Sequence, residues 1–146
     1  MTDTTERAQG LRAWADGMYT LTAAAELLIR FGQPLLTGPW VEHDPVRDRY
    51  WFNTAAVDAH GGYLSGGERR VLDLAAALAS DEHPVALGDA VSGIDRKYLD
   101  LVLAAIAHAA GSHEHSEAVT EEDKDGVPRI ICFDRLGSLH PWPEDA

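Results

Sequence analysis

The sequence has little cysteine, little basic charge and no long apolar run. Its 146 residues include a single cysteine, Cys132, so no disulfide within the chain can hold the fold, and we expect a reducing compartment. Acidic residues outnumber basic ones by 24 to 12, which gives a formal net charge of −12. A surface of this sign repels polyanions, which argues against binding to nucleic acid or to an anionic membrane.

Two further absences concern targeting. The longest strongly apolar stretch, residues 98–110, is interrupted by Asp100 and His108, whereas a bilayer span requires about 20 apolar residues. The first residues contain no basic stretch followed by an apolar run, which a secretory signal would need. We therefore expect a cytoplasmic protein with no membrane partner.

Composition and apolar periodicity predict an α+β fold that is mainly α-helical. Apolar residues make up 45% of the chain, which is typical of a globular protein, and the length suits a single domain over residues 1–146. Helical spacing predicts main helices over residues 22–31, 67–79 and 94–110. Ser65 and Ser92 each precede an acidic residue by three positions, which is the pattern of a capping box at the start of a helix. We expect these helices to form a compact domain with a small antiparallel sheet.

Aromatic and β-branched residues predict one β-hairpin. Residues 40–43 and 49–52 are two short runs of this kind, and Pro45 between them suits a turn. A two-stranded hairpin is marginal in water by itself, so one of its faces must pack on the helices. The other face is a candidate surface for a partner protein, to which we assign Trp40, Tyr50, Trp51 and Phe52.

The last third of the chain is predicted to be less regular. Residues 112–125 hold six acidic residues and one lysine, so we expect residues 112–128 to be an exposed, flexible acidic segment. Residues 129–133 are an apolar, β-branched run that predicts a strand able to join the hairpin. Two prolines near the end predict an extended tail over residues 134–146.

Residues 64–71, Leu-Ser-Gly-Gly-Glu-Arg-Arg-Val, resemble the signature motif of ABC-type ATPases. The resemblance continues at residues 85–89, whose Asp89 matches the family's magnesium-associated aspartate, and at residues 92–95, which resemble its D-loop. It extends over residues 63–111. The resemblance implies that a helix N-terminus at Ser65, Gly66 and Gly67 is directed at a phosphate held by a partner subunit.

Two departures from that family bear on the expected activity. The chain has no G-x-x-x-x-G-K-[ST] loop to hold phosphates, and Ala90 stands where the family has its catalytic glutamate. We therefore expect no ATP hydrolysis by this chain alone. The whole chain also resembles a group of small, alanine-rich bacterial proteins, from which no activity carries over.

Basic residues at two helix starts are the main candidates for binding a small ligand. Four cations lie in first turns, where the helix dipole disfavours positive charge: Arg69, Arg70, Arg96 and Lys97. If the two helix starts are adjacent, these side chains form one basic spot that binds a phosphate or a nucleotide, together with Ser65, Gly66 and Gly67.

Other reactive residue types give weak signals. His113 and His115 are weak candidates for a metal, because a structural zinc site normally has four fixed ligands and the chain has no second cysteine. Cys132 lies in an apolar run and is interpreted as a buried apolar residue. We assign no catalytic residue and expect no cofactor.

The expected function is non-enzymatic. The sequence favours an acidic protein that binds a partner protein, or itself as a homodimer, through the hairpin or the basic helix starts. The alternative is a regulator that binds a small anion or a nucleotide at residues 65–70 and 92–97. A third interpretation is an enzyme whose catalytic residues the sequence does not identify.

Overall fold

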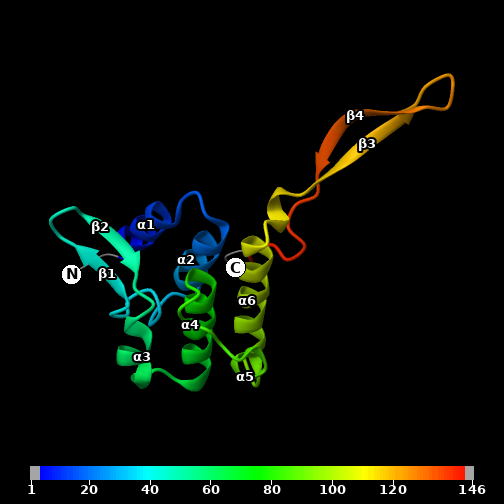
Figure 1. The fold of residues 1–146 in the computed structure, drawn as a ribbon. Coiled ribbons are helices and arrows are strands. Elements are labelled where there is room, and N and C mark those ends of the chain that lie inside the picture. Colours follow the sequence, from blue (N-terminus) through cyan, green and yellow to red (C-terminus); the bar gives the residue numbers. More distant parts are fainter. Residues whose placement is uncertain (1–3, 144–146) are drawn as a thin grey trace.

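The computed structural model describes residues 4–143, which form a helical body and a β-hairpin that projects from it (Figure 1). The fold is α+β and mainly α, as the sequence predicts. Its α-helices are α1 (Thr4–Ala15), α2 (Tyr19–Phe31), α3 (Ala56–His60), α4 (Gly66–Ala79), α5 (Leu87–Val91) and α6 (Arg96–Ala109). The strands are β1 (Val41–Asp44), β2 (Arg49–Phe52), β3 (Ser116–Glu122) and β4 (Pro128–Arg135), and the 3-10 turns are η1 (Gly61–Tyr63) and η2 (Ser112–Glu114).

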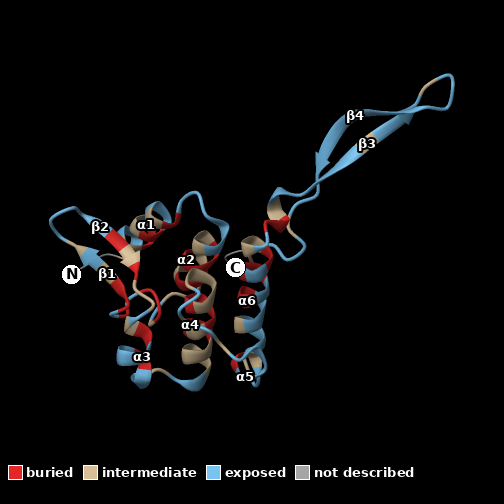
Figure 2. Ribbon diagram, in the orientation of Figure 1, coloured by how far each residue is buried: buried red, intermediate tan, exposed pale blue. Residues whose placement is uncertain are grey.

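Helix α2 is the centre of the helical body and contacts α1, α4 and α6. Its consecutive alanines Ala23, Ala24 and Ala25 are fully buried, as are Leu27 and Leu28. Buried positions that follow one another directly mean that neighbours cover more than one side of the helix, and small alanine side chains let those neighbours approach closely. The buried residues accordingly gather where the helices face each other (Figure 2).

Local capping signals set the starts of α4 and α6. Helix α4 begins directly after Ser65, whose side chain caps it. Helix α6 begins two residues later than expected, and its N-cap is Asp95 rather than Ser92. Ser92 instead ends α5, and Gly93, with a φ of 69°, turns the chain between the two helices.

The β1–β2 hairpin forms where the sequence predicts it. Its strands are antiparallel, and Glu42 pairs with Trp51. In the turn, the Asp44 carboxylate accepts hydrogen bonds from the backbone N–H groups of Val46 (2.9 Å) and Arg47 (3.3 Å). An aspartate that bonds to its own turn in this way stabilises the connection without help from the helices.

Most aromatic residues of this hairpin belong to the core, which corrects the interface assigned from the sequence. Trp40 is fully buried, and Tyr50 and Phe52 are 6% and 4% exposed. Helix α1 comes so close that a Cβ on Gly10 would lie 2.2 Å from the Tyr50 ring. Of the four assigned residues, Trp51 alone is half-buried, because neighbouring strand residues point to opposite faces.

Residues 112–128 carry regular structure instead of the irregular segment that their acidic composition predicts. They include η2 and β3, and β3 pairs antiparallel with β4 in a separate two-stranded sheet. The strand expected at residues 129–133 therefore exists, but it pairs with the acidic segment and not with the first hairpin. Figure 1 shows this second hairpin extending away from the end of α6.

Beyond β4 the chain returns to the helical body. The Leu139 N–H donates a hydrogen bond of 2.9 Å to the hydroxyl of Ser112, which is 6% exposed. Trp142 packs against the core, and the guanidinium of Arg30 lies 4.9 Å from the centre of its ring. Of the tail predicted over residues 134–146, residues 134 and 135 belong to β4, residues 136–143 form neither helix nor strand, and residues 144–146 lie outside the described part. No helix within residues 4–143 is long and apolar enough to cross a bilayer.

Candidate functional site

The start of α4 is closed by its own side chains. The Glu68 N–H donates to the Ser65 hydroxyl at 3.2 Å, and the Ser65 N–H donates to the Glu68 carboxylate at 2.9 Å. This capping box uses the donors that a phosphate would need and places a carboxylate beside them. Gly66 and Gly67 lie in the first turn, and a Cβ on Gly67 would meet the ring of Tyr98 at 3.4 Å, so the two helix starts are adjacent.

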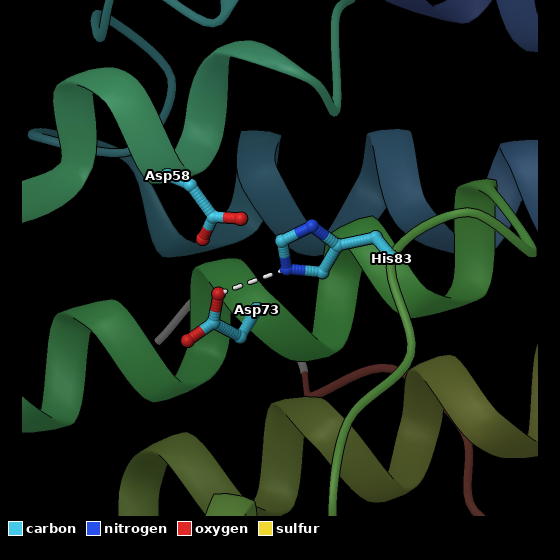
Figure 3. A group of neighbouring side chains, drawn as sticks. All are labelled: Asp58, Asp73 and His83. Carbon is cyan, nitrogen blue, oxygen red and sulfur yellow. Dashed lines mark hydrogen bonds and ion pairs between the residues drawn. The ribbon is translucent and has the colours of Figure 1, made fainter.

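Arg69 is neutralised by two aspartates. Its guanidinium donates to Asp58 of α3 at 2.6 Å and to both carboxylate oxygens of Asp73 at 3.2 Å. His83 completes the group, because its Nε2 lies 3.0 Å from Oδ1 of the same Asp73 carboxylate (Figure 3). The sequence does not indicate this network, because Asp58 and His83 become neighbours of Asp73 only when three separate segments fold together.

These residues line a cavity of about 610 Å³ between α3, α4, α5 and the turn before α5. Its walls carry the two cations Arg69 and Arg70, the imidazole of His83, and four carboxylates, those of Asp58, Asp73, Glu82 and Asp89. Carboxylates outnumber guanidiniums in this cavity, so an anion would meet repulsion as well as attraction. Asp89, the residue that matches the magnesium-associated aspartate of the ABC-type family, lies on this wall.

The other two candidate cations are elsewhere. Arg96 and Lys97 line a second cavity of about 680 Å³, with Asp95, Leu99, Asp100 and Leu103. The four cations expected at one basic spot are therefore divided between two cavities, although the helix starts themselves are close. Arg69 is held by Asp58 of α3 and Asp73 of α4, and neither aspartate lines the cavity of Arg96 and Lys97.

A metal ion would have to compete with Arg69 for the carboxylates. The ligand atoms of Asp58, Asp73 and His83 lie within 4.8 Å of one another, the only such group of three that residues 4–143 contain. Arg69 already bonds to both aspartates, and Asp73 also bonds to His83. The cluster is thus complete as an ion-pair network, which fastens α3 and the turn before α5 to α4.

The histidines suggested by the sequence as metal ligands lie at the root of the β3–β4 hairpin. The His113 ring stacks on the His108 ring, with 4.0 Å between centroids and an angle of 2° between planes, and Tyr19 packs edge-on against both. Burial, and next the neighbouring His113, lower the pKa of His108 below its ordinary value. His115 is exposed and takes no part in this stack.

The β3–β4 hairpin is the largest exposed feature that sequence analysis did not foresee. Ala118 and Thr120 lie on one face of β3, and their partners across the hairpin are Phe133 and Ile130. We call these four residues the apolar hairpin face. Ile130 is 62% exposed and Phe133 is 65% exposed. Figure 2 shows that nothing in the helical body covers the hairpin.

The opposite face of the hairpin is more polar. Val119 and Cys132 pair at its centre, between Glu117 paired with Asp134 and Glu121 paired with Arg129. Cys132 is an exposed free thiol, which corrects its interpretation as a buried residue. Ile131 is an extra residue in β4, where the register shifts, and is 58% exposed.

A turn signal in the sequence could have predicted this hairpin. The Asp123 carboxylate accepts hydrogen bonds from the N–H groups of Asp125 (2.9 Å) and Val127 (3.0 Å), and Gly126 has a φ of 75°. Asp-Gly between two runs with β-forming residues is a strong hairpin signal. No family model, curated protein or solved structure matches this chain, so the functional argument rests on these surfaces alone.

Proposed function

We propose that this chain is a non-enzymatic protein that acts by binding another polypeptide through the β3–β4 hairpin. The observation that carries the proposal is the apolar hairpin face, with Ile130 and Phe133 more than half exposed. A two-stranded hairpin is marginal in water without packing on one face, and the helical body does not provide that packing. A bound polypeptide would cover the apolar face and stabilise the hairpin at the same time.

The alternative of a regulator that binds a small anion has less support. Its basic residues are divided between two cavities, and Arg69 is already paired with Asp58 and Asp73. Its serine cap is used by Glu68. An anion would therefore have to break existing charge-assisted hydrogen bonds before it could bind.

A reducing compartment such as the cytoplasm suits this function. Cys132 lies exposed on the hairpin, on the face opposite the apolar one. In an oxidising compartment an exposed thiol forms mixed disulfides, whereas cytoplasmic reductants keep it free.

Photo-crosslinking from the two faces of the hairpin tests the proposal. A Thr120→Cys, Cys132→Ser variant carries a benzophenone maleimide on the apolar face, and the unsubstituted chain carries the same label at Cys132 on the opposite face. We expect crosslinks to a polypeptide mainly from the apolar face, either in purified protein or after addition of an extract of the producing cells. Adding Phe133→Asp to the labelled variant should abolish them. Equal yields from both faces, or yields unaffected by Phe133→Asp, would contradict the proposal.

A further inference from the structure

A second exposed apolar surface lies on α6. This helix buries one side against α2 and α4, while Leu99, Leu103 and Ile106 remain 36%, 37% and 44% exposed. Because they are four and three residues apart, they form one line along the outside of the helix. We call these three residues the α6 stripe. The first turn of α6 carries Arg96 and Lys97, which are both exposed.

We propose that the apolar hairpin face of one copy of this chain packs along the α6 stripe of a second copy, and that the second hairpin does the same in return. This inference rests on the proposed function and identifies the bound polypeptide as the chain itself. Within one copy the two surfaces cannot meet, because the hairpin leaves the end of α6 and points away from it (Figure 1).

The hairpin and the helix that carry the two surfaces are similar in length. Strands of seven and eight residues are about 25 Å long, and a helix of 14 residues is about 21 Å long. A two-fold axis near η2 places each hairpin alongside the other copy's α6. In this arrangement the hairpin root lies near the end of the second α6, and the hairpin tip lies near its beginning.

The charges match in the same orientation. The hairpin tip carries four carboxylates and one lysine: Glu121, Glu122, Asp123, Asp125 and Lys124. The tip meets the first turn of the second α6, where the Arg96 and Lys97 side chains make no ion pair to any residue in 4–143. The positive pole of that helix adds to the attraction. The second copy's hairpin thus accounts for cations in a position that the helix dipole disfavours.

The contact area approaches that of a specific dimer only if both contacts form. A contact limited by the roughly 21 Å length of α6, and about 10–12 Å wide, covers roughly 230 Å² on each surface. Two reciprocal contacts have four such surfaces and bury roughly 900 Å², close to the area of about 1,000 Å² expected of a biological interface. Two hairpins packed only on each other would bury about half of that area, which is typical of unstable contacts.

Sedimentation equilibrium over a range of concentrations tests the inference. The unsubstituted chain should be a dimer, and both Phe133→Asp and Leu103→Asp should weaken association at least about tenfold, which is 1.4 kcal/mol. Val46→Asp is the matched control and should leave the dimer unchanged, because Val46 is 92% exposed on the other hairpin. If circular dichroism shows that Phe133→Asp has lost helical structure, Ile130→Asp replaces it as the hairpin variant. In the same way, Ile106→Asp replaces Leu103→Asp as the α6 variant.

A mixture of the two variants is the most specific test. Phe133→Asp retains an intact α6 stripe and Leu103→Asp retains an intact hairpin, so a mixed pair keeps one of its two contacts. The mixture should associate more tightly than either variant alone. A chain that is monomeric throughout overturns the inference, as does a dimer that Leu103→Asp leaves intact. In either case the crosslinking experiment still decides whether the hairpin binds a different polypeptide or another surface of this chain.

Charge reversal tests the orientation. Arg96→Glu with Lys97→Glu should weaken the dimer, and adding Glu122→Lys, on the face of Ala118 and Thr120, with Asp125→Lys in the turn should restore it. If the second pair of substitutions weakens the dimer further, the hairpin tip does not lie at the start of the second α6.

Discussion

Trp40 distinguishes a core role from an interface role for the β1–β2 hairpin. Its side chain is fully buried, and its indole N–H donates a hydrogen bond of 2.8 Å to the Leu35 carbonyl oxygen. Trp40→Ala removes the largest fully buried side chain, and substitutions of this kind cost about 3–5 kcal/mol. Single domains have a free energy of unfolding of about 5–15 kcal/mol, so we expect this variant to lose a large part of its stability.

Trp51 is the matched control, since it lies in the same hairpin but is half-buried on the other face. Trp51→Ala removes less apolar contact, so we expect a loss of about 1–2 kcal/mol. Urea unfolding followed by far-ultraviolet circular dichroism measures both losses from the shift in midpoint at constant slope. Equal losses for the two variants, or no loss for Trp40→Ala, would refute the assignment of Trp40 to the core.

Two further predictions concern the hairpin root and the tight turn before β1. The pKa of His108 is lowered in the folded state, so as the pH falls the unfolded chain binds a proton at this histidine before the folded chain does. The free energy of unfolding should therefore decline below about pH 6.5, the ordinary pKa of histidine, until the pH has fallen through the lowered pKa. His108→Gln should flatten this decline of the urea midpoint, whereas the exposed His140→Gln should not. A Cβ at Gly38 would lie 2.0 Å from the buried Trp40 ring, so Gly38→Ala should lower the free energy of unfolding by about 1–3 kcal/mol or more. Gly62 is the control, because a Cβ there would have open space around it. Gly62→Ala should change the free energy of unfolding by less than about 1 kcal/mol from that of the unsubstituted chain. A similar loss in both variants would argue against the close approach at Gly38.

Features encoded within a few residues could be predicted from the sequence. The Ser65–Glu68 capping box starts α4 at the expected place, and the aromatic runs around Pro45 form the expected hairpin. Both depend on bonds between close neighbours in the chain, such as the two that join Ser65 and Glu68. The same pattern at Ser92 failed because Asp95, three residues later, is itself a good N-cap and Gly93 places the turn ahead of it.

Features that depend on distant partners could not be predicted. Nothing near Trp40 in the sequence indicates that it is covered on all sides, because that depends on how the helical body packs around the hairpin. The pairing of Arg69 with Asp58 joins α4 to α3, and it cancels a charge that sequence reasoning counted as free. For the second hairpin, the acidic composition of residues 112–128 concealed an Asp-Gly turn that was in principle readable.

A net charge of −12 on each copy opposes the proposed dimer, but screening limits this repulsion. At physiological ionic strength the Debye length is about 8 Å, so charges further apart than this contribute little to association. The hairpin tip and the start of α6 would approach to within that distance, and there the signs are opposite. Added salt should therefore weaken the dimer, because it screens these local ion pairs, and a dimer that salt strengthens would contradict the placement of the hairpin tip at the start of α6.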